Sequence, residues 1–119
     1  MTRTAEEIID HHVAALAAGN VDAVVADYAE DARFVTTDGV VAGRASLAKT
    51  IAGIVEQFPG FTVTIVNLVV DDDIVLLEWT ADTQGHVLTD GVDTFLIRDD
   101  RIQLQTARFT VHAKESFDT

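Results

Sequence analysis

The chain of 119 residues contains no cysteine, one proline, and eight lysine and arginine residues together. Without cysteine there is no disulfide framework and no thiolate chemistry, and a reducing compartment is allowed. No apolar run reaches the length of a transmembrane helix, and the N-terminus lacks the basic and then apolar pattern of a signal peptide. We therefore expect a cytoplasmic protein.

Basic residues are so few that the formal net charge is −12 at pH 7. A surface this acidic repels phosphate backbones and anionic membranes, so we expect no nucleic-acid partner and no membrane partner. The sequence also lacks a glycine-rich phosphate loop, a nucleophile elbow and the close histidine spacing typical of metal ligands. We therefore expect neither a metal nor a cofactor.

Length and composition predict one globular domain over residues 1–119. A chain of this size with 48% hydrophobic residues is long enough for one core but not for two. We expect an ordered core over about residues 4–113 and a loose tail over residues 114–119.

Two helices are predicted at the start of the chain. The capping-box pattern Thr4-Ala5-Glu6-Glu7 places the start of the first helix near Ala5. Gly19-Asn20 then supplies a break, because glycine suits a left-handed helix end and asparagine caps the next helix. The apolar stripe of this second helix closes at Tyr28, and we expect the helix to end near residues 30–31.

The rest of the chain predicts a hairpin, a third helix and a sheet. The hairpin covers residues 33–36 and 40–42, Ser46 caps the third helix, and Pro59-Gly60 ends it. Runs rich in Val, Ile and Thr then predict four antiparallel strands, over residues 61–70, 74–84, 87–98 and 101–113. The predicted fold class is α+β, with a curved antiparallel sheet wrapped as a cone around three N-terminal helices. Such a sheet leaves a cavity at its wide end.

His12 is the first polar residue expected on an apolar face. It lies four residues from both Ile8 and Leu16 and so shares their side of the first helix, whereas His11 should meet solvent. Two interpretations stay open: a packed histidine with one satisfied nitrogen, or a hydrogen-bond donor or proton shuttle that lines the cavity.

Asp93 is the second such residue. Strand alternation places it on the same face as Phe95 and Ile97. If that face meets the helices, desolvation would raise the pKa of Asp93 enough to keep it protonated near neutrality. The alternative is that this face meets solvent or a second subunit, or that Asp93 lies at a bulge.

Aromatic residues are the candidates for the cavity wall. Trp79 alternates with Val75, Leu77 and Ala81, which predicts a core or pocket position. Tyr28 could place its hydroxyl at the cavity mouth or be purely structural. The other candidates for contact with a ligand are Thr36 and the four phenylalanines Phe34, Phe58, Phe95 and Phe109.

Several segments resemble the nuclear transport factor 2-like superfamily, which has a cystatin-like fold, and in particular its SnoaL-like and ketosteroid isomerase-like members. The similarity extends from about Ala5 to His112, which is essentially the whole chain. It is specific for fold but not for activity, because this fold hosts enzymes, binding modules and scaffolds alike. The segments that carry it are His12–Leu16, Gly19–Asp22, Tyr28–Ala32, Glu78–Thr80 and Val92–Phe95.

The resemblance implies roles for individual residues. Asp93 falls where the isomerases have a protonated aspartic acid, Phe109 where they have an apolar pocket residue, and His12 where they have an oxyanion-hole tyrosine. Thr36 falls where they have the base carboxylate, and a threonine cannot take a proton from carbon at neutral pH. Asp38, two residues further on, is the candidate for the missing base. Ketosteroid isomerisation of the usual kind is therefore not expected.

The functional hypothesis is a protein, forming a homodimer through its sheet, that binds a small hydrophobic carbonyl compound. Cofactor-free proton transfer of the isomerase, cyclase, lyase or hydrolase kind would use His12 and Asp93 as its polar pair. The main alternative is a non-catalytic ligand-binding or dimerisation module, suggested by the missing base at Thr36. A protein-docking adaptor is the third possibility and would need a large exposed apolar patch.

Overall fold

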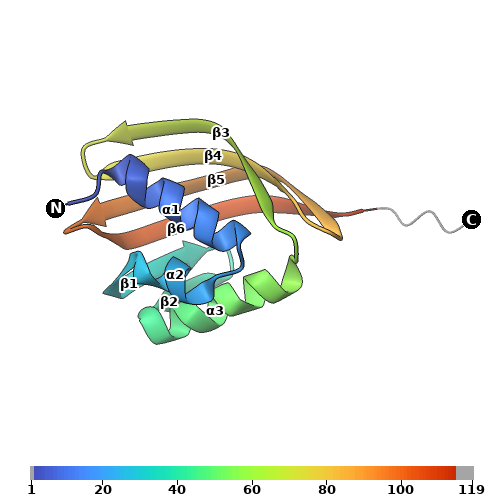
Figure 1. Ribbon diagram of the computed structural model, residues 1–119, viewed down its shortest axis with the longest axis horizontal. Coiled ribbons are helices and arrows are strands. Elements are labelled where there is room, and N and C mark those ends of the chain that lie inside the picture. The colour runs from blue at the N-terminus through green and yellow to red at the C-terminus, as the bar shows by residue number, and fades with distance from the viewer. Residues whose placement is uncertain (1, 115–119) are drawn as a thin grey trace, which may run out of the picture.

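The computed structural model describes residues 2–114 and confirms the predicted α+β class. Three helices lie on one face of a curved, unclosed sheet of six strands (Figure 1). The elements in chain order are α1 (Ala5–Ala17), α2 (Val21–Ala26), β1 (Tyr28–Thr36), β2 (Gly39–Ala42), α3 (Arg44–Gln57), β3 (Thr62–Asp71), β4 (Ile74–Asp82), β5 (His86–Arg98) and β6 (Arg101–Ala113).

The sheet has the strand order β2-β1-β6-β5-β4-β3. Strands β3 to β6 form the predicted antiparallel meander, and each lies within two residues of its predicted bounds. The first hairpin, β1 and β2, joins the meander by a parallel pairing of β1 with β6, in which Tyr28 lies opposite Ile102. This pairing places the start of the chain's first strand beside its last strand and closes one side of the cavity region.

The predicted start of α1 is confirmed in detail. The Thr4 hydroxyl accepts from the Glu7 backbone N–H at 3.1 Å, and the Glu7 carboxylate accepts from the Thr4 N–H at 2.9 Å. Gly19 has a φ of 68°, and the Asn20 side chain accepts from the Ala23 N–H at the start of α2. Local capping chemistry therefore fixes the first turns of α1 and α2, as the sequence predicts.

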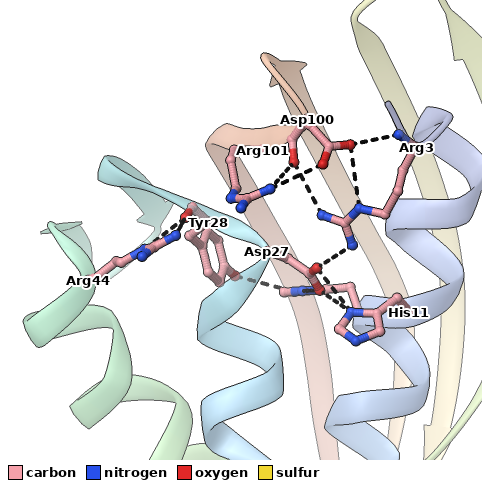
Figure 2. Close-up of polar contacts among 8 residues, drawn as sticks. Arg3, His11, Asp27, Tyr28, Arg44, Asp100 and Arg101 are labelled. Carbon is pink, nitrogen blue, oxygen red and sulfur yellow. Dashed lines mark hydrogen bonds and ion pairs between the residues drawn. The ribbon is translucent and has the colours of Figure 1, made fainter. Parts of the chain in front are cut away.

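The prediction for the end of α2 was wrong. The helix ends at Ala26, and Tyr28 opens β1 instead of closing a helical stripe. The backbone carbonyl of Asp27 accepts from the Ile102 N–H at 2.8 Å, and that of Tyr28 accepts from the Arg44 guanidinium at 2.9 and 2.6 Å (Figure 2). Both carbonyls thus bind distant residues, so they are not available to extend the helix.

The prediction that Ser46 caps α3 was also wrong. The helix begins two residues earlier, at Arg44, after Gly43 with a φ of 87°. The Gly43 carbonyl accepts from the Leu47 N–H at 2.9 Å, and glycine occupies this φ at little steric cost. The helix ends before Pro59, as predicted.

Only part of the predicted C-terminal tail can be compared. Residues 115–119 lie outside the described residues. Lys114 is held rather than loose, because its ammonium donates to the Thr83 carbonyl and lies 2.8 Å from the Asp82 carboxylate. Within residues 2–114, no helix is long and apolar enough to cross a membrane.

The predicted alternation of inward-facing residues is confirmed on the two strands that carry the candidate site. Trp79 is buried on the same face of β4 as Val75, Leu77 and Ala81. Asp93 is buried on the same face of β5 as Phe95 and Ile97. The helices pack Ile8, Ile9, Leu47 and Ile51 against this face of the sheet.

Trp79 lies directly on Gly91, its partner across the β4–β5 ladder. A Cβ atom at Gly91 would be 2.4 Å from Cδ2 and Cε2 of the indole. The strand is irregular here, since the pairing register of β5 with β6 shifts between Thr89 and Val92 and Asp90 has a φ of 55°. Only a residue without a side chain permits the indole to take this position.

Asp27 is a buried carboxylate that joins the N-terminal segment, α1 and β1. One oxygen accepts from Arg3 Nη1 at 2.9 Å, and the other accepts from Nδ1 of His11 at 2.8 Å and of His12 at 3.3 Å (Figure 2). His11, expected in solvent, is about half exposed. Arg3 also reaches the turn between β5 and β6, where its backbone N–H donates to Asp100 at 2.8 Å. Burial by itself would raise the pKa of Asp27, but these donors outweigh burial and lower it to about 2.

We expect Asp27→Asn to lower the free energy of unfolding by about 2 kcal/mol at pH 7, because each pKa unit corresponds to about 1.36 kcal/mol. A lowered pKa stabilises the fold above the unfolded-state value and stops doing so as the pH falls. The difference between the parent and the variant should therefore shrink as the pH drops from about 4 toward 2. Urea unfolding across this range measures it. Asp10→Asn, at an exposed position of α1, is the control, and a pH-independent difference would contradict the expectation.

We expect Gly91→Ala to displace the indole of Trp79 and to destabilise the fold by about 1–3 kcal/mol, as overpacking of a core does. Urea unfolding measures the loss, and the fluorescence of the chain's single tryptophan reports the displacement. Gly85→Ala is the matched control, because a Cβ there meets no atom within 4 Å. Equal stability and equal fluorescence of the two variants would contradict the prediction.

Candidate functional site

A cavity of about 80 Å³ lies between the helices and the inner face of the sheet. Most of its wall is aliphatic and aromatic, and a few polar side chains project into it. The lining residues are His12, Val13, Leu16, Tyr28, Phe34, Ile51, Ile54, Phe58, Phe61, Val63, Leu77, Trp79, Leu88, Asp93, Phe95, Gln105, Ala107 and Phe109.

The structure brings together most of the residues predicted for the site. Both members of the predicted polar pair, His12 and Asp93, line the cavity, as do all the predicted aromatic residues: Tyr28, Phe34, Phe58, Trp79, Phe95 and Phe109. Thr36 and Asp38 are not among the described residues that line it. Asp38 is exposed in the turn after β1, where its backbone N–H donates to the Thr36 hydroxyl at 3.1 Å. Strand β1 therefore brings no carboxylate to the cavity.

Asp93 is the acidic group of the cavity and is 7% exposed. Its Oδ1 accepts from the Trp79 indole N–H at 2.9 Å, and its Oδ2 accepts from the Gln105 amide at 2.7 Å. Burial raises the pKa of Asp93, and the two hydrogen bonds, which favour the ionised form, offset part of this effect. The carboxyl group is thus held at a fixed position in an apolar wall.

His12 is buried on α1 between the Asp27 carboxylate and the aromatic rings of Tyr28 and Phe95. Its Nδ1 faces the Asp27 carboxylate, and its Nε2 lies 3.3 Å from the Tyr28 hydroxyl. The imidazole meets the rings of Tyr28 and Phe95 edge-on, with centroids 5.2 and 6.1 Å apart. Among the described residues, no hydrogen bond joins His12 directly to Asp93.

Tyr28 and Gln105 connect the two ends of the predicted pair. The Tyr28 hydroxyl donates to Gln105 Oε1, and Gln105 Nε2 donates to Asp93. Burial raises the pKa of Tyr28 above its ordinary value, and the charges of Asp93 and Asp27 add to this effect, so the phenol keeps its proton. One polar chain therefore runs from Asp27 through His12, Tyr28 and Gln105 to Asp93.

Two members of this hydrogen-bonded chain, Gln105 and Asp27, were not predicted from the sequence. Gln105 shares the inner face of β6 with Ala107 and Phe109, so the alternation that identified Asp93 would have identified it too. Asp27 gave no comparable signal, because it lay inside a predicted helix and its partners Arg3 and His11 are 24 and 16 residues away.

The cavity suits a compact apolar molecule with an oxygen atom that faces Asp93. Its volume is below the roughly 300–1,000 Å³ of sites for drug-sized ligands. A second hollow, of about 240 Å³, shares the side chains of Leu16, Ile54, Phe58 and Phe61 with it. A larger ligand would have to displace these side chains. Within residues 2–114, no three His, Asp or Glu side chains converge as metal ligands.

Solved structures with the same fold include proteins of several kinds. SalBIII, an epoxide hydrolase/cyclase-like enzyme with a role in pyran ring formation in the polyether salinomycin, aligns with a TM-score of 0.79 and 18% identity over 92% of this chain and 95% of that chain. A candidate ketosteroid isomerase from Kribbella flavida gives 0.72 and 17% over 95% and 79% of the two chains. An NTF2-like protein of unknown function from Cytophaga hutchinsonii gives 0.77 and 14% over 92% and 93%.

At these identities the structural neighbours show a shared fold and not a shared activity. A search among curated proteins gives no match. The family model for the SnoaL-like domain matches residues 9–105, which is most of the chain. The protein therefore belongs to the SnoaL-like domain family, and its fold is that of the NTF2-like and ketosteroid isomerase-like proteins.

Proposed function

We propose that the cavity binds a small hydrophobic carbonyl compound and that the protein catalyses cofactor-free proton transfer on it, in an isomerisation, cyclisation or hydrolysis. The observation that carries this proposal is Asp93, a carboxyl group buried in an apolar cavity wall with its pKa raised by that burial. Buried titratable groups with shifted pKa values are typical of catalytic sites.

Asp93 can act in either of two protonation states. When protonated, it donates to a ligand oxygen, and when ionised, it accepts a proton from carbon or from a water molecule. The Trp79 indole holds the carboxyl group in place in both states, since its N–H donates to Oδ1. Exclusion of water by the aromatic wall strengthens the interaction of this group with charge that develops on the ligand.

Two of the structural neighbours support this class of reaction, because one is named as epoxide hydrolase/cyclase-like and the other as a candidate ketosteroid isomerase. Ketosteroid isomerisation with a base from β1 is disfavoured for the present chain, since Thr36 and Asp38 lie outside the cavity. The lack of a β1 carboxylate in the cavity wall favours the second candidate function, a ligand-binding module that performs no chemistry.

We expect Asp93→Asn to lower kcat/KM by about 10²–10⁴-fold, the usual contribution of general acid–base catalysis, while the melting temperature changes little. Turnover is measured on a panel of enones, polyketide-like aromatics and steroids, after a thermal-shift screen of the same panel. Asp90→Asn, at an exposed position of β5, is the matched control.

Unchanged turnover in Asp93→Asn would overturn the catalytic role of this residue. A compound that raises the melting temperature of the parent protein but is never converted would favour the binding module. The turnover assay and the thermal-shift screen together distinguish these two results.

We also propose that a second copy of the chain docks on the outer face of the sheet. Val69 and Ile74 are 48% and 47% exposed, and the strand register sets them beside the outward-facing Leu76 and Leu96. These side chains form one apolar surface on the outer face of the sheet, which is typical of a subunit interface.

Ile74→Lys should convert a dimer to a monomer, because it places a charge within this apolar surface. Light scattering coupled to gel filtration measures the change. Val40→Lys, on the exposed strand β2 away from this surface, should leave the dimer intact. A parent protein that is monomeric at micromolar concentration would refute the proposed dimer.

A further inference from the structure

Two members of the polar chain between Asp27 and Asp93 have a fixed protonation state. Asp27 stays ionised, because its pKa is about 2, and it therefore only accepts; the Nδ1 atom of His12 must carry a proton to donate to it. Burial holds the proton on the Tyr28 hydroxyl. The positions that can gain or lose a proton are therefore Nε2 of His12 and the carboxyl group of Asp93.

One arrangement of protons follows from the hydrogen bonds as the structure has them. Gln105 Nε2 donates to Asp93, which is then a carboxylate, and Gln105 Oε1 accepts the proton of Tyr28. The Tyr28 oxygen has no further proton to offer and accepts from His12 Nε2. In this arrangement His12 is a cationic imidazolium.

A half-turn of the Gln105 amide reverses the direction of the chain. Protonated Asp93 then donates to the amide oxygen, the amide nitrogen donates to the Tyr28 oxygen, and the Tyr28 hydroxyl donates to Nε2 of a neutral His12. Tyr28 and Gln105 keep the number of protons they had. The net change is one proton fewer on His12 and one more on Asp93, so the two arrangements have the same charge and the same number of hydrogen bonds.

The two remaining arrangements each leave the chain unsatisfied. With no proton on either group, the lone pair of His12 Nε2 faces the Tyr28 oxygen while the Tyr28 proton is bound to Gln105. With a proton on both groups, the Tyr28 oxygen receives two donors and its own proton has no acceptor. Unmatched groups of this kind are costly in a buried site, where water cannot replace the missing partner.

We propose that Gln105 is a positioning residue that makes His12 and Asp93 share a single proton, by turning its amide between Tyr28 and Asp93. The amide couples the two sites because it is donor on one side and acceptor on the other, and either orientation satisfies the whole chain.

The consequence of proton sharing for catalysis rests on the proposed function, whereas the test of proton sharing does not. A shared proton makes both states of Asp93 accessible without a change in the charge of the buried site. The same carboxyl group can then start a reaction as an acid or as a base. Proton sharing itself is a property of the free protein and is measurable without a ligand.

The charged and titratable groups around the pair come from every element packed on it. His12 is faced by Asp27 and Tyr28 of the α2–β1 segment, with His11 and Arg3 behind Asp27. Asp93 is faced by Trp79 of β4 and Gln105 of β6. Of the residues described, the titratable side chains that line the cavity are His12, Tyr28 and Asp93.

The test is an NMR titration of the full chain without ligand. The carboxyl carbon of Asp93 and the imidazole nitrogens of His12 are followed together. His86 and His112, which are not part of the hydrogen-bonded chain from Asp27 to Asp93, are internal controls. In the parent protein we expect both signals to change in two steps at the same two pH values, with part of each change in each step, as for a coupled pair.

Gln105→Met removes the amide at similar volume and should leave each of the two signals with a single step of its own. Tyr28→Phe breaks the chain at another residue and should have the same effect. Gln103→Met is the matched control on β6, because that amide donates to the Arg98 carbonyl and not to the chain, so the two-step curves should persist.

Single, separate steps for His12 and Asp93 in the parent protein would overturn the inference, whether or not the variants fold. Two-step curves that survive Gln105→Met would also overturn it, since the coupling would then be purely coulombic. Either result leaves the proposed catalysis to be judged from the turnover of Asp93→Asn.

Discussion

The ionised carboxylate of Asp27 is the interaction on which the rest of this structure depends. It is 1% exposed, and such a charge is tolerated only when donors surround it. Arg3 and two consecutive histidines supply those donors, so one side chain fixes the N-terminal segment, the orientation of α1 and the first residue of β1. It also determines which nitrogen of His12 carries a proton. The protonation states of the residues in the cavity therefore depend on Asp27, which is not one of its lining residues.

The hydrogen-bonded chain from Asp27 to Asp93 lies in surroundings that contain few other polar groups. Aromatic and aliphatic side chains surround Gln105, Tyr28 and Asp93, so each hydrogen bond among them is stronger than it would be in water, and each unmatched group is more costly. The indole of Trp79 donates to the Asp93 carboxyl group while it packs directly against Gly91. A small residue on one strand thus positions an aromatic ring on the next, and that ring positions the acid. Packing and electrostatics act on the same few atoms here.

The features that could be predicted from the sequence are those that depend on neighbours along the chain. The capping box at Thr4 and the alternation that buries Trp79 and Asp93 involve residues within a few positions of each other, and both predictions are confirmed. The end of α2 could not be predicted, because the carbonyl of Asp27 is bound by Ile102 of the last strand. Asp27 itself looks like any surface carboxylate until Arg3 and His11 are placed beside it. Gln105 is different, since its position between inward-facing residues was visible in the sequence.

The parallel pairing of β1 with β6 has a consequence for the order in which the chain acquires its shape. Tyr28 and Gln105, which are hydrogen-bonded to each other in the cavity wall, are separated by more than seventy residues of chain. Closing a segment of that length carries an entropic cost that must be met before the contacts within it are gained. During synthesis, the helices and the first hairpin emerge well before the strand that carries Gln105. Until that strand arrives, the carbonyl of Asp27 lacks its strand partner and Tyr28 lacks its amide partner. The link from Tyr28 through Gln105 to Asp93 is thus completed last.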